Sequence, residues 1–227
     1  DLRRSRGLGD VYKRQFKGSA PAQINIPRDM WTQVIDIELP PIIKFERPSG
    51  GSEAIKEAAK LLSNADFPVI LSGAGVVLAD AINDCKALAE KLDSPVASGY
   101  QHNDSFPGSH PLAVGPLGYN GSKAAMELIS KADVVLALGT RLNPFSTLPG
   151  YGIDYWPKDA AIIQVDINSD RIGLTKKVSV GICGDAKQVA QQLLNSLSPE
   201  AGNKNRDERK ALIHQTKSAW LQTLSSM

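Results

Sequence analysis

The chain has 227 residues, of which 42% are hydrophobic and 22% charged. This composition excludes wholesale disorder and fibrous architectures, and the length fits one ordinary domain with residues to spare. The formal net charge of +2 is too small to indicate nucleic acid or an anionic membrane as a partner, and no uncharged apolar run reaches the ~18 residues of a membrane span.

The basic charge is concentrated in residues 1–15, which hold five basic and two acidic side chains, so the rest of the chain sums to −1. The segment lacks the apolar stretch of a secretory signal. A phosphate-binding arm is one interpretation. We favour an atypical extension, either a leader or an artefact of sequence assembly.

Cysteine and histidine are scarce and widely spaced. Cys85 and Cys183 are too far apart in sequence to indicate a disulfide framework or a metal knuckle, and no pair of the three histidines has metal-ligand spacing. We therefore expect no metal site in this chain, and two reduced thiols in a cytoplasmic protein.

The first elements in chain order resemble the end of one domain followed by a linker. Residues 23–26 alternate polar and apolar side chains, which predicts a short strand that Pro27 ends. We assign residues 16–31 to the end of a preceding domain. Residues 32–51, with three prolines and a closing Gly-Gly pair, are predicted to be a linker.

Residues 52–198 alternate helical and strand patterns. Helices are predicted at 52–64, with Ser52 as N-cap, and at 79–92, 122–132 and 186–197. Apolar strands are predicted within 68–75, 94–99, 133–140, 161–167 and 178–185, and long loops at 99–120 and 143–160. Because such strands are apolar on both faces, the pattern predicts an α/β fold of Rossmann-like type, a parallel sheet with helices on both faces. Residues 199–227 are predicted to be a second linker and a helix leading to a further domain.

Candidate binding residues lie where strands end, since ligands of such sheets bind at the carboxyl ends of the strands. Gly73 and Gly75 would allow backbone to approach a phosphate, but a tight turn explains them equally well. Gly139 precedes Arg141, whose guanidinium suits a phosphate or carboxylate, or else a surface ion pair. Asp166 would bind a ribose hydroxyl or cap the following turn. The residues alone thus indicate a nucleotide-type domain without catalytic machinery.

An ordered set of segments resembles the thiamine-diphosphate enzymes of the acetolactate synthase group. The set is APAQINIPRD, PVILSGAGV, FPGSHPLAVGPLGYNG, ADVVLALGTRL, IIQVDINSDRIG and VGICGDAK, and it covers residues 18–198. Within the group, TRLNPFSTLPGYGIDYWPKDA and RIGLTKKVSVGICGDAK are similar to the sulfoacetaldehyde acetyltransferases.

The resemblance implies a central domain between a pyrimidine-binding N-terminal domain and a C-terminal domain. It also implies a homodimeric or homotetrameric enzyme that uses thiamine diphosphate and Mg²⁺ to convert sulfoacetaldehyde and phosphate into acetyl phosphate and sulfite. The family's activating glutamate and its Gly-Asp-Gly…Asn motif belong to the flanking domains, so no catalytic residue is assigned here. In related members FAD or ADP binds at positions that match Gly73, Gly75, Gly139, Arg141 and Asp166.

Three alternatives remain open at this point. The chain could derive from acetolactate synthase or another thiamine-diphosphate decarboxylase. It could be a free-standing nucleotide-binding module, or a structural domain that holds two catalytic domains.

Overall fold

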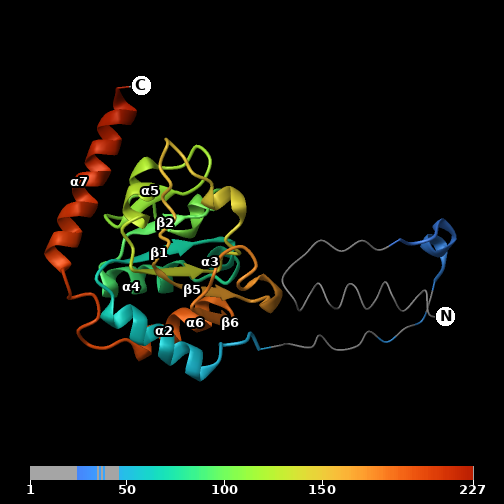
Figure 1. Ribbon diagram of the computed structural model, residues 1–227. Helices are drawn as coiled ribbons and strands as arrows, with labels where there is room; N and C mark the ends of the chain where they lie inside the picture. The colour runs from blue at the N-terminus through green and yellow to red at the C-terminus, as the bar shows by residue number, and fades with distance from the viewer. Residues whose placement is uncertain (1–24, 35, 37, 39–45, 227) are drawn as a thin grey trace. The chain divides into compact units, whose positions relative to one another are not determined.

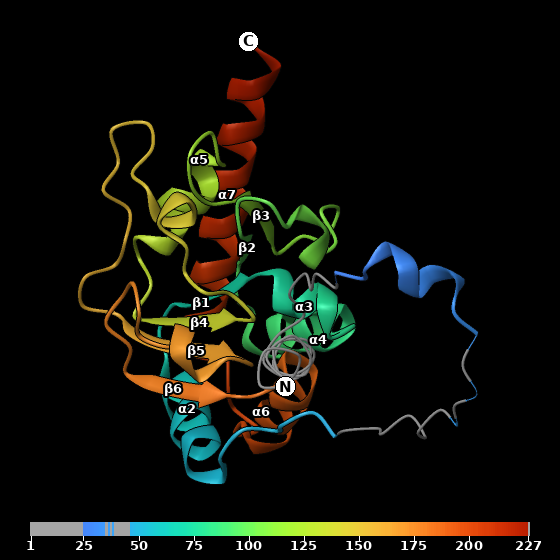
Figure 2. The same ribbon diagram turned by 90° about the vertical axis from the view of Figure 1, so that its right-hand side faces the viewer.

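A parallel six-stranded sheet forms the centre of the fold in a computed structural model that describes residues 25–34, 36, 38 and 46–226. The strands follow the spatial order β3-β2-β1-β4-β5-β6, which Figure 2 shows from top to bottom. They are β1 (Pro68–Ser72), β2 (Val96–Ser98), β3 (Ala113–Pro116), β4 (Val134–Leu138), β5 (Ala161–Asp166) and β6 (Val180–Cys183).

The helices pack on the sheet in two groups (Figure 1). In one group α6 packs against both α2 and α4, and in the other α5 packs against α7. Their bounds are α2 (Ser52–Asn64), α3 (Ala74–Leu78), α4 (Ile82–Leu92), α5 (Lys123–Ile129), α6 (Ala186–Ser196) and α7 (Arg206–Ser225). The expected α/β class and parallel sheet are confirmed.

The two central strands, β1 and β4, lie in the middle of the hydrophobic core. All five residues of β1 and all five of β4 are buried, because helices cover the sheet on either side of them. β1 pairs with β4 along its whole length, from Pro68 opposite Val134 to Ser72 opposite Leu138. Uniformly apolar strands are therefore the sequence signature of this sheet, as expected.

Helix α2 illustrates how the apolar spacing determines burial. Its residues at helical spacing, Ile55, Ala58, Ala59 and Leu62, are all buried. The prediction that Ser52 caps this helix is wrong. Ser52 is the first helical residue, and the N-cap is Gly51, whose backbone is extended and which supplies no side-chain hydrogen bond.

The predicted helix at 79–92 begins too early. The structure has a short α3 before it and starts α4 at Ile82, because Asp80 adopts a left-handed conformation (φ 52°) that interrupts the helix. The loop expected over 99–120 contains β3, which pairs with β2. This four-residue strand, AVGP, was hidden because its Gly and Pro are disfavoured in strands, although an edge position tolerates them.

Outside the main unit, residues 25–34 contain the 3₁₀ helix η1 (Arg28–Thr32). The described half of the strand expected at 23–26, Asn25 and Ile26, is assigned to no strand, and residues 23–24 lie outside the described residues. The extension at 1–15 and residues 35, 37 and 39–45 of the linker also lie outside them. The domain boundaries proposed from the sequence stay predictions.

Candidate functional site

The order of the strands reverses direction at β1. From β1 the chain proceeds through α4 to β2 and β3 on one side of the sheet, and then returns to β4 on the other side. Such a switch point leaves a crevice beyond the carboxyl ends of the two central strands, where α/β sheets bind ligands. Gly73 and Gly75 follow β1, Gly139 and Arg141 follow β4, and Asp166 ends β5, so the structure brings all five predicted residues to one edge.

The glycines at this edge pack against one another. A Cβ on Gly75 would lie 2.6 Å from the Cα of Gly139, and one on Gly73 would lie 2.6 Å from the Cβ of Thr140. The amide of Gly75 also donates to the carbonyl of Gly139 at 2.8 Å. Gly139 has a φ of +62°, a conformation that other residues rarely adopt. The close contact between the two loops therefore accounts for these glycines without a phosphate.

Asp166 is buried and turned toward its own backbone. Its Oδ1 accepts the amide hydrogen of Asn168 at 2.8 Å, the turn-capping role considered from the sequence. Burial raises the pKa of the Asp166 carboxyl above its usual value, and the Asn168 amide and the positive charges of Arg171 and Arg141 partly offset this rise. The carboxylate is thus held near two cations at the edge of the sheet.

Gln164, which sequence reasoning missed, joins the strand-end loops from inside β5. Its Nε2 donates to the carbonyls of Thr140 and Arg171, each at 3.2 Å, and its Oε1 accepts the amide hydrogen of Gly173 at 2.9 Å. A glutamine within an apolar strand was the available signal, because a buried amide needs partners for its donors and acceptor.

The contacts at this edge account for its residues without a bound nucleotide. The space beside Gly73 and Gly75 is occupied by the loop after β4, Asp166 caps a turn, and Arg141 is exposed. Binding of FAD or ADP at this edge stays a prediction.

Among the described residues no group of three or more His, Cys, Asp or Glu side chains is placed to hold a metal ion. None of the described helices is long and apolar enough to cross a membrane.

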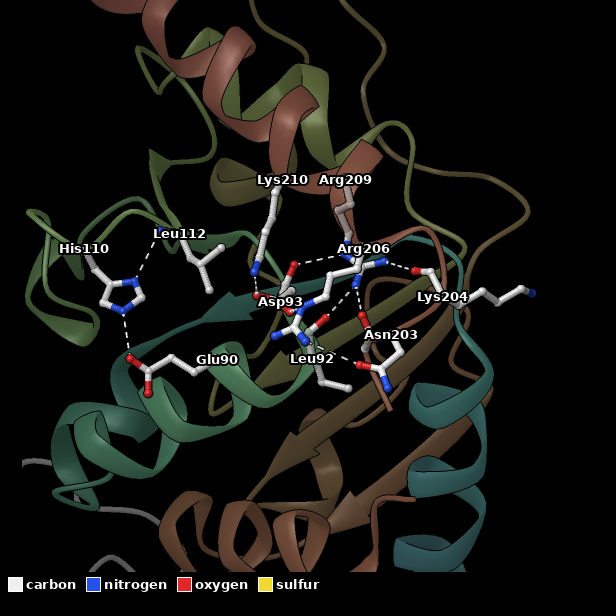
Figure 3. A network of polar contacts seen from close by, with 11 residues as sticks. Glu90, Leu92, Asp93, His110, Leu112, Asn203, Lys204, Arg206, Arg209 and Lys210 are labelled. Atoms are coloured by element: carbon white, nitrogen blue, oxygen red, sulfur yellow. Dashed lines mark hydrogen bonds and ion pairs between the residues drawn. The ribbon is translucent and has the colours of Figure 1, made fainter. Parts of the chain in front are cut away.

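A second polar cluster surrounds Arg209 and attaches α7 to the rest of the fold (Figure 3). The buried guanidinium uses all five of its N–H donors. They reach the carbonyls of Leu92, Asp93, Gly202, Lys204 and Asp66, at 2.5–3.0 Å. Burial lowers the pKa of Arg209, and the charge of Asp93 partly offsets this.

Neighbouring charges complete this cluster. Asp93 forms ion pairs with Arg206 and, at 3.2 Å, with Lys210. Beyond it, Lys217 of α7 donates to the carbonyls of His110 and Pro111, at 3.3 and 2.7 Å. The part of α7 from Arg206 to Lys217 is therefore held to the end of α4 and to the loop before β3.

The strand order and the switch point place the chain in the class of doubly wound α/β domains. The comparisons identify the family. The model described as "Thiamine pyrophosphate enzyme, central domain" matches residues 55–193, and the chain belongs to this family.

Sequence relatives specify the family branch. The chain is 77% identical over 97% of its length to a probable sulfoacetaldehyde acetyltransferase of Rhizobium meliloti, and 75% identical over 97% to a sulfoacetaldehyde acetyltransferase of Roseovarius nubinhibens. A probable acetolactate synthase large subunit of Methanocaldococcus jannaschii is 38% identical over 78% of the chain. The chain spans only 37% and 36% of the length of the first two relatives.

A solved structure shows the same fold. Benzoylformate decarboxylase from Polynucleobacter necessarius superposes with a TM-score of 0.63 at 21% identity, over 79% of this chain and 33% of that one. At this identity the likeness supports the architecture alone.

Proposed function

We propose that the full-length protein is a thiamine-diphosphate-dependent sulfoacetaldehyde acetyltransferase, of which this chain supplies the central domain. The observation that carries the proposal is the 77% identity to a probable sulfoacetaldehyde acetyltransferase over 97% of the chain. Identity to the acetolactate synthase relative is half as high, which disfavours that alternative.

In this proposal the chain has a structural role, and the reaction takes place on residues of the flanking domains. Thiamine diphosphate, when bound, supplies the carbanion chemistry needed to release sulfite from sulfoacetaldehyde and to pass the acetyl group to phosphate. The residues of this chain fix the strand-end loops through Gln164 and the Gly75–Gly139 contact, and they anchor the segment that follows the domain through Arg209. No catalytic residue is proposed within it.

The remaining expectations belong to the same proposal. The full-length enzyme requires Mg²⁺ to hold the diphosphate, acts in the cytoplasm and forms a homodimer or homotetramer. Its central domain has an optional adenine nucleotide, FAD or ADP, at the strand-end site. Its ligands are small molecules, with neither nucleic acid nor a membrane as partner.

The test is an assay of the purified full-length protein with sulfoacetaldehyde and phosphate. We expect sulfite and acetyl phosphate in equal amounts, with both lost when thiamine diphosphate or Mg²⁺ is withheld. Omission of phosphate should abolish acetyl phosphate. Acetolactate formation from pyruvate, without sulfite release from sulfoacetaldehyde, would instead favour the acetolactate synthase alternative.

A further inference from the structure

An apolar surface is formed by two loops and the end of α7. Tyr119 is 59% exposed, Phe145 61% and Leu221 60%. We define the apolar surface by the exposed residues Tyr119, Phe145, Leu148, Tyr151, Leu221 and Leu224. Scattered exposed apolar residues are ordinary on proteins, but a contiguous group indicates an interaction site.

Two contacts join the loops and the helix that carry these residues. The amide of Tyr119 donates to the carbonyl of Phe145 at 3.4 Å, which joins the two loops. The rings of Tyr151 and Trp220 meet edge to face with centroids 5.6 Å apart, which joins the second loop to α7. Leu224 lies one turn beyond Trp220 on the same face of the helix. In Figure 1 α7 passes beside these loops, and its last turn extends beyond them.

The backbone beneath the surface is fixed. A Cβ on Gly118, which has a φ of +98°, would lie 2.2 Å from the carbonyl oxygen of Phe145, so the loops are in close contact. The hydroxyl of Tyr151 donates to the carbonyl of Gly121 at 3.1 Å, and the side chain of Asn143 accepts the amide hydrogen of Phe145 at 2.9 Å. The exposed rings are thus presented on an ordered frame, and such preorganised aromatic anchors favour binding.

The position of α7 indicates the occupant. The chain spans only 37% and 36% of the length of two relatives, and the family model that it matches is described as a central domain, so we expect further domains on both sides of it. Leu221 and Leu224 lie within five residues of the last described residue, so polypeptide that continues from α7 starts next to the apolar surface. A tethered partner has an effective concentration in the millimolar range, which favours it over a second copy of the chain.

We propose that the apolar surface is the docking site for the domain that follows residue 227 in the full-length protein. The proposal rests on the proposed function to the extent that the protein continues beyond this chain. It assigns Phe145 and Tyr119 as anchors that enter an apolar recess of that domain, and Leu221 and Leu224 as the contacts made next to the connection.

The first test measures whether the surface is covered in the full-length protein. Phe145→Cys and, as a matched control, Lys56→Cys on α2 are labelled with a maleimide, and mass spectrometry of the labelled peptides gives each rate. The Lys56 side chain is 69% exposed, close to the exposure of Phe145. Relative to the unfolded protein, we expect at least tenfold slower labelling at position 145 and little protection at position 56. Labelling at position 145 as fast as in the unfolded protein would overturn the proposal.

The second test identifies the occupant. A benzophenone attached at position 145 is activated in the native full-length protein, and the product is separated under denaturing conditions. We expect a crosslink within one chain, to a peptide that follows residue 227. A product of twice the chain mass, or a crosslink to a peptide that precedes residue 47, would overturn the assigned occupant.

Neither measurement uses catalysis, so the two proposals fail separately. Slow labelling at position 145, in a protein that releases no sulfite from sulfoacetaldehyde, would contradict the proposed function but would still support the docking surface.

Discussion

Arg209 of α7 donates from Nη2 to the carbonyl of Leu92, the last residue of α4, at a distance of 3.0 Å. The terminal carbonyls of a helix have no partner within the helix, and here one arginine satisfies two of them, those of Leu92 and Asp93. The same side chain serves carbonyls after α2 and before α7. One buried cation therefore links α4 to α7, alongside the ion pairs of Asp93 with Arg206 and Lys210.

Replacement of Arg209 should destabilise the protein strongly. Arg209→Met leaves five carbonyls without their donor, and Arg209→Lys restores at most three bonds, because an ammonium has three hydrogens. We expect Arg209→Met to lower the free energy of unfolding by about 3–5 kcal/mol, the usual cost of breaking a buried charged network. Denaturant unfolding provides the measurement.

The matched control is Lys210→Gln, which removes a half-exposed ion pair with the same Asp93. Exposed pairs contribute about 0–1 kcal/mol, so this variant should remain close to wild type. An equal, small effect of both substitutions would show that the Arg209 network does not hold α7.

A methyl group at Gly75 should destabilise the fold even though Gly75 lies in a helix. Gly→Ala inside a helix normally gains about 1 kcal/mol. Here the added Cβ would lie 2.6 Å from the Cα of Gly139, so the loops after β1 and β4 must separate. We expect Gly75→Ala to cost about 1–3 kcal/mol, the range for overpacked sites.

Gly108→Ala provides the comparison, because a Cβ at that position meets nothing within 4 Å. It should change the free energy of unfolding by less than about 0.5 kcal/mol. A Gly75→Ala variant as stable as wild type would mean that the two loops are not in tight contact.

The sequence predicted those parts of the fold that depend on local patterns. The apolar runs within 68–72 and 134–138 are buried strands, and the helical spacing from Ile55 to Leu62 is the buried face of α2. The parallel arrangement followed because strands apolar on both faces need cover on both faces.

Features determined by distant contacts were not predictable. The strand β3 forms because β2 offers an edge, and its own residues AVGP favour no strand. At the site, the sequence placed Gly73, Gly75, Gly139, Arg141 and Asp166 at strand ends, but it could not show that Gly75 and Gly139 fill each other's space. Nor did it indicate that Arg209, in a segment resembling a linker, is buried.

The two thiols should react at very different rates. Burial raises the pKa of Cys85 to about 12, so almost none of it is thiolate at neutral pH, whereas Cys183 is exposed. With a disulfide reagent at neutral pH, we expect Cys183 to react quickly and Cys85 only after unfolding. Peptide mass spectrometry assigns the positions, and Cys183→Ser should remove the fast reaction. Rapid modification of Cys85 in the folded protein would contradict the structure.

Arg141 provides a direct test of the strand-end site. If the full-length protein binds ADP, Arg141→Gln should weaken the affinity at least tenfold, since charge-assisted hydrogen bonds contribute about 1.5–3 kcal/mol. Lys158→Gln, at a side chain that is 78% exposed, is the control and should leave the affinity unchanged. Titration calorimetry gives both constants. Equal binding by both variants would exclude Arg141 as a phosphate ligand, and the absence of ADP binding to wild type would contradict an ADP site there.

Asp166 should make stability depend on pH with a definite sign. Burial raises the pKa of its carboxyl in the folded state, so in the window between the unfolded and folded pKa values the folded protein holds more protons. The free energy of unfolding contributed by this group therefore falls as the pH rises through that window, and the penalty is complete above the folded pKa. Asp166→Asn keeps an oxygen for the Asn168 amide and has no charge to bury. Relative to wild type, the variant should thus gain stability as the pH rises, as denaturant unfolding at a series of pH values would show. A stability difference that does not change with pH would show that the neighbouring positive charges fully offset the burial of this carboxylate, and a change in the opposite direction would show that they outweigh it.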